Sequence, residues 1–105
     1  MKPIIVETKL LTFFRLAGIV LYPFVLVYDK SKQNLMNHEL IHFQQVKECG
    51  FFKFYYLYVC FWHKTGSYYN IPFEMEAYLN EQDDSYLSKR EVMAWRKYCY
   101  KQKDS

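Results

Sequence analysis

The segment Asn37-His38-Glu39-Leu40-Ile41-His42 has the residue types and the spacing to bind a metal ion. On a helix, His38 and His42 lie one turn apart on the same face, so both imidazoles can reach one zinc ion at about 2.0–2.1 Å. Glu39 is rotated by about 100° from His38, which places its carboxylate beside the ion. There it can accept a proton from a water that the ion holds. The segment therefore predicts a zinc site with Glu39 as general base.

A third ligand must come from another segment, because a catalytic zinc usually has three protein ligands and one open position. The segment Ile71–Tyr78 offers Glu74 and Glu76, which face different ways on a helix because they are two residues apart. His63, at the end of an aromatic run, is the alternative third ligand. A surface helix whose histidines have no function, or a structural metal, is the alternative to a catalytic site.

The two segments resemble the gluzincin metallopeptidases, in which H-E-x-x-H on one helix is completed by a glutamate from a later helix. In several families that second motif reads E-x-x-A-D, and Glu74-Met75-Glu76-Ala77-Tyr78 matches it except at its last position. The resemblance implies that Glu74 is the third zinc ligand and that the fold is a minimal zincin-like one. It also implies a zinc-dependent hydrolase of the peptidase type, with a peptide or protein as substrate.

Tyr78 stands where those families have an aspartate, which orients a zinc-bound histidine. Either the tyrosine hydroxyl or a carboxylate from Glu76, Glu48 or Glu81 is expected to take that role. Some small archaeal gluzincins are held inactive by their own C-terminal segment, so the C-terminal helix of this chain is a candidate cover for the site. Whether it covers the site is left open at this point.

The chain also resembles a group of short bacterial proteins that share N-H-E-x-I-H, a glutamine-rich continuation and F-E-x-E-A-Y. The segments that fit are Asn37–His42, Gln44-Gln45 and Phe73–Tyr78, with a looser fit at Tyr86-Leu87 and Trp95–Tyr98. This resemblance covers most of the chain and implies no activity. Between the two metal-binding segments lie Tyr68 and Tyr69, either of which could stabilise an oxyanion through its hydroxyl.

The chain has 105 residues, enough for one small domain, and no repeat or linker divides it. Strands are expected over residues 2–8 and on both sides of Pro23 in the apolar stretch Leu10–Tyr28. The helices expected after them cover residues 34–49 with Asn34 or Asn37 as cap, 51–64, from Asn70 or Pro72 to 81, and 88–101 with a Ser88-x-x-Glu91 capping box. In the last helix Val92, Trp95 and Cys99 are expected to face inward. Strands followed by helices predict a single α+β domain over residues 1–105.

The formal charge of +3 is too small to indicate a nucleic-acid partner. The three cysteines form no C-x-x-C pair, which indicates free thiols in a reducing compartment and a cytoplasmic location.

A membrane is the main alternative environment. Leu10–Tyr28 is long enough to span a bilayer, but Arg15, Gly18 and Pro23 argue against a membrane helix. The basic and aromatic residues of 89–101 are also compatible with a membrane-surface helix, and the aromatic block 51–62 could line a cleft or enter lipid. A metal-binding domain without catalysis and a membrane-associated protein are thus the alternatives to the hydrolase.

Overall fold

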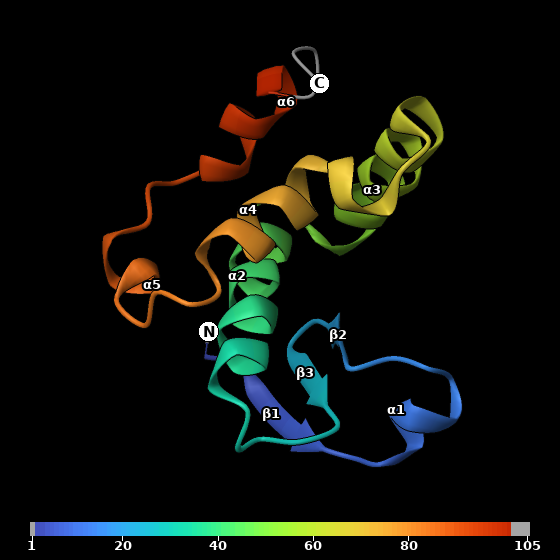
Figure 1. The fold of residues 1–105 in the computed structure, drawn as a ribbon, viewed down its shortest axis with the longest axis vertical. Coiled ribbons are helices and arrows are strands. Elements are labelled where there is room, and N and C mark those ends of the chain that lie inside the picture. Colours follow the sequence, from blue (N-terminus) through green and yellow to red (C-terminus); the bar gives the residue numbers. More distant parts are fainter. Residues whose placement is uncertain (1, 102–105) are drawn as a thin grey trace.

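The computed structural model describes residues 2–101 of the chain. Its elements in sequence order are β1 (Ile4–Glu7), α1 (Leu10–Phe13), β2 (Gly18–Leu21), β3 (Phe24–Val27), α2 (Gln33–Cys49), α3 (Phe51–Thr65), η1 (Tyr68–Asn70), α4 (Pro72–Asn80), α5 (Tyr86–Lys89), η2 (Ala94–Lys97) and α6 (Tyr98–Lys101). Apart from the short helix α1, the strands come first and the helices follow (Figure 1). The α+β class predicted from the sequence is confirmed.

The three strands form one sheet with β3 in the centre. β1 pairs with β3 in parallel, with Ile4 opposite Phe24, and β2 pairs with β3 antiparallel, with Gly18 opposite Val27. Pro23 lies in the turn between β2 and β3, where the proline needs no N–H for the ladder. β2 is thus an edge strand, and both β2 and β3 contact the longest helix, α2.

The two strands expected on either side of Pro23 are confirmed as β2 and β3, but Leu10–Phe13, at the start of the apolar stretch, form the helix α1 and not a strand. The carbonyl of Lys9 is satisfied locally, because it accepts hydrogen bonds from the backbone N–H and the hydroxyl of Thr12. Such local bonds compete with a strand ladder for the same backbone groups.

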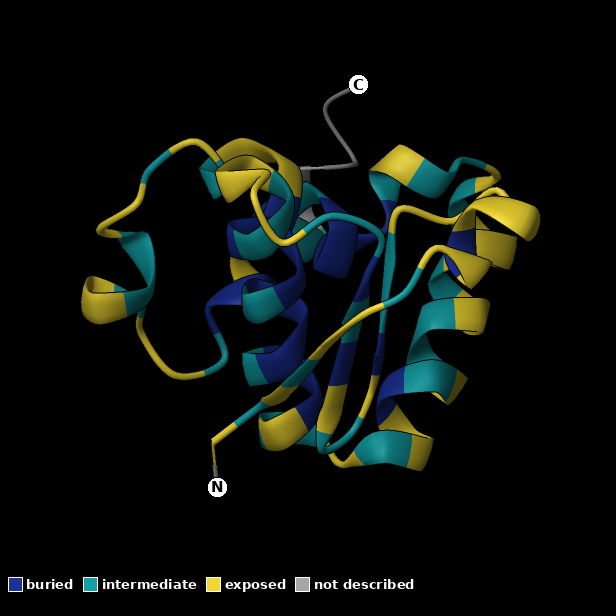
Figure 2. Ribbon diagram, turned by 90° about the horizontal axis from the view of Figure 1, so that it is seen from below, coloured by how far each residue is buried: buried dark blue, intermediate teal, exposed yellow. Residues whose placement is uncertain are grey.

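The helix α2 lies in the centre of the molecule, with the sheet on one side and α3 and α4 on others (Figure 1). Its residues Ile41, Phe43 and Val46 are completely or almost completely buried. The main apolar cluster unites all these elements and consists of Val20, Val25, Val27, Phe43, Val46, Phe54, Ile71, Phe73 and Trp95. In Figure 2 the buried positions concentrate around α2 and the middle of the sheet, while the outer helices carry the exposed ones.

The start of α2 differs from the expectation, because it begins at Gln33 and has no side-chain cap from Asn34 or Asn37. Asn37 is instead a buried residue inside the helix, and its side-chain amide donates to the Glu81 carbonyl and to the Asp84 carboxylate. Gly50 separates α2 from α3 as expected, with a φ of 91° that favours glycine.

The last predicted helix, 88–101, is wrong in the structure. α5 ends at Lys89, and Met93 has a φ of 60° and donates its backbone N–H to the Glu48 carboxylate. This tertiary hydrogen bond replaces the capping box that the sequence suggested. Trp95 is buried against Phe73 as expected, but Val92 is 80% exposed. Across residues 2–101, none of the helices has both the length and the apolar character that crossing a membrane requires.

Candidate metal centre

Three buried side chains from two helices converge on one point. His38 and His42 come from α2, and Glu74 comes from the first turn of α4. Glu74 Oε1 lies 3.0 Å from Nε2 of each histidine, and the two Nε2 atoms are 3.2 Å apart. The four-residue spacing on α2 places the two rings on one face, and the contact between α2 and α4 brings the carboxylate to them.

These distances match the donor set of a zinc ion. Ligand atoms bound tetrahedrally at about 2.0–2.1 Å are separated from each other by about 3.3 Å. The three observed separations, 3.0, 3.0 and 3.2 Å, are close to that value. Two imidazole nitrogens and one carboxylate oxygen are also ligands that zinc accepts in proteins. The three residues can therefore hold a metal ion.

The second nitrogen of each ring has its own partner. His38 Nδ1 lies 2.7 Å from a carboxylate oxygen of Glu81, and His42 Nδ1 lies 2.7 Å from the side-chain oxygen of Gln45. Both partners are acceptors, so each Nδ1 carries a proton and donates it. In the neutral ring Nε2 is then unprotonated, which is the form that binds a metal.

The second oxygen of Glu74 accepts a hydrogen bond of 2.6 Å from the Tyr58 hydroxyl. Burial opposes charge in this cluster, but the attraction between Glu74 and His42 outweighs it. The carboxylate raises the pKa of His42 to about 9, and the imidazoles hold the pKa of Glu74 far below its usual range. The carboxylate is thus ionised. With a pKa of about 9 the His42 ring is protonated at Nε2 near neutral pH, and a metal ion would have to displace this proton to bind there.

Glu39 is buried next to this cluster on the same helix. Burial raises the pKa of its carboxyl above the usual value, despite the nearby imidazoles of His42 and His38. Gly18 in β2 lies against it, because a methyl group at the Gly18 Cα would fall 2.7 Å from Cδ and Cγ of Glu39. The edge strand therefore fixes the position of this side chain.

Two cavities open beside the cluster, and Glu39 lines both of them. One cavity, of about 270 Å³, has mostly apolar walls from β2 and α3, and His42 and Glu74 also line it. We call it the apolar cavity. The other, of about 380 Å³, is lined by Arg15, His38 and Glu81 among others and is called the polar cavity. The metal ligands and Glu39 thus lie between two spaces that a substrate could occupy.

The tyrosines named from the sequence differ in position. Tyr68 lines both cavities, whereas Tyr69 is 65% exposed and lines neither. Tyr78 packs its ring against the His38 ring at 4.5 Å between centroids. The carboxylate that contacts Nδ1 of His38 comes from Glu81, one of the alternatives that the sequence left open.

The remaining candidates fall outside the cluster. His63, the alternative third ligand, is exposed near the end of α3 and does not belong to the cluster. Glu76 faces away from Glu74 as expected and accepts hydrogen bonds from Arg90 and Gln45. None of the residues 82–99 lines either cavity, so these residues give no support to the cover that the archaeal resemblance suggested.

Some residues that support the site were not identified from the sequence. Gln45 connects His42 to Glu76, and Arg90 joins the buried Glu76 to Glu48. The position of Gln45, three residues after His42 on a helix, is the signal that could have shown it. Tyr58 gave no such signal, because it is one of eleven tyrosines.

Comparison of the chain with models of known protein families, with curated proteins and with solved structures found no match. The candidate centre therefore rests on its own geometry.

Proposed function

We propose that the chain is a zinc-dependent hydrolase of the peptidase type. The observation that supports this proposal is the convergence of His38, His42 and Glu74 within 3.2 Å of each other, with the buried Glu39 carboxylate between two cavities. A purely structural zinc site is usually closed by four protein ligands. Here three ligand atoms meet beside open space, which leaves a position for water and substrate.

The chain's own residues have separate tasks in this proposal. A zinc ion, when bound, supplies a positive charge that lowers the pKa of a water molecule and polarises a substrate carbonyl. Glu39 accepts the proton of the attacking water and passes it to the nitrogen of the leaving amine. Its position suits this task, because the carboxylate is buried beside the candidate metal ligands and lines both cavities.

Tyr68 is the candidate for the substrate's carbonyl oxygen, since it lines both cavities. Burial and the nearby Glu74 raise the pKa of its hydroxyl, so that this group stays protonated and can donate a hydrogen bond. A donor that points at the oxygen where negative charge develops stabilises the transition state. Tyr69 is assigned no such role, because it is exposed outside both cavities.

The experiment that tests the proposal combines metal analysis with a cleavage assay. Purified protein is expected to bind about one zinc per chain, since one three-residue cluster is present in the described residues. Glu39→Gln should keep the zinc and reduce hydrolysis of an unstructured protein such as casein by about 10²-fold or more. Glu91→Gln, at an exposed glutamate, is the matched control and should leave both properties unchanged.

Two results would contradict the proposal. If the wild-type chain binds no zinc, the metal centre is wrong. If the wild-type chain binds zinc but shows no cleavage under any tested condition, or only cleavage that persists in Glu39→Gln, the chain is a metal-binding domain without this catalysis.

A further inference from the structure

The helix α3 carries an apolar stripe that points away from the protein. Phe52, Tyr56 and Val59 follow the helical spacing i, i+4, i+7 and are 85%, 68% and 63% exposed. Amphipathic helices of globular proteins normally turn such a stripe toward the core. On α3 the core side is already occupied by Phe54 and its neighbours, so the exposed stripe is a second apolar face without a partner in the described chain.

The helix α1 also exposes apolar side chains to solvent. Leu10, Phe13 and Phe14 follow the spacing i, i+3, i+4 and are 71%, 81% and 66% exposed, whereas Leu11 points inward and is buried. A helix of four residues that, with the residue after it, exposes three large apolar side chains gains nothing from them in water. A contact outside the described chain would give these side chains a function.

The two helices that carry these exposed side chains lie on one side of the molecule (Figure 1). α1 and α3 both lie on the side away from α5, below and above the level of α2 (Figure 1), and Figure 2 places them on that same side. Leu16, just after α1, and Trp62, from α3, both line the apolar cavity. Residues next to α1 and within α3 therefore contribute to the wall of the cavity at the candidate metal centre.

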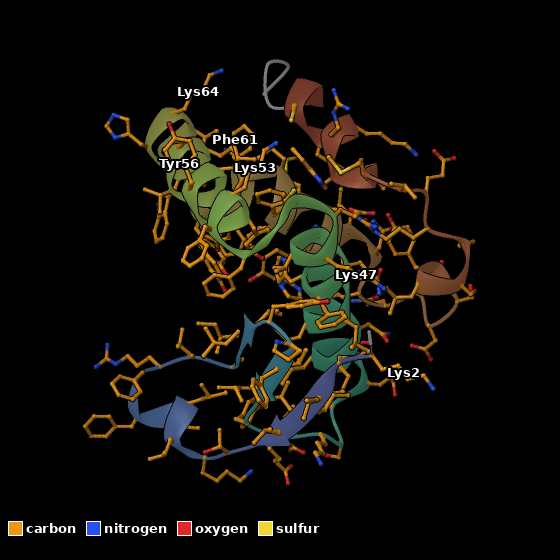
Figure 3. All side chains as sticks on the ribbon, turned by 180° about the vertical axis from the view of Figure 1, so that it is seen from behind. Lys2, Lys47, Lys53, Tyr56, Phe61 and Lys64 are labelled. Atoms are coloured by element: carbon orange, nitrogen blue, oxygen red, sulfur yellow. The ribbon has the colours of Figure 1, made fainter. Side chains whose placement is uncertain are left out.

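The charge of these segments is entirely positive. Residues 8–28 and 49–73 contain no aspartate or glutamate, although the chain has eleven of them, and they carry Lys9, Arg15, Lys53 and Lys64. In Figure 3 Lys53, Tyr56 and Lys64 all project outward from α3. Two copies of this face would repel each other, whereas a surface with negative charges and an apolar interior would complement it.

From this combination we infer that α1 and α3 dock on a lipid bilayer with anionic head groups. Phe13, Phe14, Phe52 and Val59 enter the boundary between head groups and acyl chains, as the apolar face of an interfacial helix does. Tyr56 and Trp62 lie at the level of the head groups, where such rings are enriched. Lysine side chains at the border contact the anionic groups. The inference does not depend on zinc or on hydrolysis.

The test is flotation of the full chain with vesicles of phosphatidylcholine, with and without phosphatidylglycerol. The wild-type chain should float with the anionic vesicles, and high salt should release it because the charges are screened. Phe13→Ser with Phe14→Ser, or Phe52→Ser with Val59→Ser, should reduce the bound fraction by about tenfold or more. Leu79→Ser with Val92→Ser is the matched control, since both residues are exposed apolar side chains outside α1 and α3.

Charge is tested in the same assay. Lys53→Gln with Lys64→Gln should weaken binding to anionic vesicles, while Lys2→Gln with Lys47→Gln, which project elsewhere (Figure 3), should change it less. A second measurement needs no destabilising variant: lipids brominated in their acyl chains should quench the fluorescence of Trp62, and Trp62→Phe should remove the quenching because Trp95 is buried.

Three results would overturn the inference. The first is wild-type protein that floats with neither vesicle type, and the second is flotation that the α1 and α3 variants leave unchanged. The third is a dimer in solution, without lipid binding, that Phe52→Ser with Val59→Ser dissociates. That result would assign the stripe to a second copy of the chain.

Discussion

Gly18 in the edge strand and Glu39 in α2 are in such close contact that a single methyl group at the glycine would collide with the glutamate. The added Cβ would lie 2.7 Å from both Cγ and Cδ of Glu39 and 3.0 Å from its Oε2. The atoms in its way belong to a side chain, so Glu39 and not the backbone would have to shift. The strand thus fixes the carboxylate that the proposed chemistry uses.

Gly18→Ala is therefore expected to separate stability from activity. Alanine in a strand restricts the unfolded chain and costs little if Glu39 moves aside, so the melting temperature should change only slightly. Zinc binding should persist, because His38, His42 and Glu74 are not touched. Hydrolysis should fall by about tenfold or more, since a small displacement of a catalytic group is costly.

A double-mutant cycle gives the control for this variant. If Gly18→Ala acts by displacing Glu39, adding it to Glu39→Gln should reduce activity no further. Additive losses would show that the strand affects the reaction in another way.

Gln45 is expected to be a positioning residue for His42. Its side-chain oxygen accepts the Nδ1 proton of His42, and its amide is held by the Phe73 carbonyl and by Glu76. Gln45→Leu removes this acceptor and should weaken zinc binding by about 10- to 100-fold, the usual effect of losing such a partner. Competition with a fluorescent chelator measures it. Gln44→Leu, at the neighbouring position, should retain the wild-type affinity for zinc. Equal zinc affinities of the Gln45→Leu and Gln44→Leu variants would contradict the positioning role of Gln45.

The sequence predicted which residues form the cluster better than it predicted the structure around them. His38 and His42 can be paired from their spacing alone, because helix spacing is a local property. Only the resemblance to the gluzincin motif favours Glu74 over Glu76 and His63 as the third residue. The partner of His38 stayed open among Glu76, Glu48, Glu81 and Tyr78, because the packing of α2 on α4 and the turn after α4 decide which side chain reaches the ring.

The C-terminal part could be predicted least. Ser88 and Glu91 have the spacing of a capping box, yet the chain there is arranged by Arg90 and by the hydrogen bond from Met93 to Glu48. These contacts join residues more than forty positions apart, and no local pattern shows them. Similarly, Leu10–Phe13 was expected in a strand on apolar content alone, whereas local hydrogen bonds to Lys9 make it helical.

Arg90 is expected to be the most important ion-pairing residue for stability. Its guanidinium is almost fully buried and contacts both Glu76, which is completely buried, and Glu48. Arg90→Met would leave these carboxylates without a counter-charge and should reduce the free energy of unfolding by about 3–5 kcal/mol. Urea denaturation measures this change. Lys89→Met, which removes the exposed ion pair with Asp83, should cost less than about 1 kcal/mol.

The role of the arginine can be checked by a second substitution. Adding Glu76→Gln to Arg90→Met removes one of the two stranded charges and should restore part of the lost stability. If it does not, the effect of Arg90→Met comes from lost packing of the side chain.

Tyr68 is expected to act on the substrate, and Tyr58 on the metal ligand. Tyr58 donates to the second oxygen of Glu74 at 2.6 Å, so Tyr58→Phe should weaken zinc binding. Tyr68 lines both cavities, and Tyr68→Phe should lower kcat by about 10²-fold while KM and the zinc affinity change little. Tyr69→Phe, at the exposed neighbour, should leave all three quantities unchanged.

Measurement of zinc affinity beside the kinetics distinguishes the two possible roles of Tyr68, because its hydroxyl also lies near the Glu74 carboxylate. A residue that only holds Glu74 would lose zinc affinity on substitution to the same extent as Tyr58→Phe, and activity would return at saturating zinc. A residue that stabilises the developing oxyanion would show the rate loss even when the metal site is full. Recovery of the Tyr68→Phe rate at high zinc would therefore show that the Tyr68 hydroxyl acts by holding the metal ligand Glu74. Neither Tyr58 nor Tyr68 would then donate to the oxyanion.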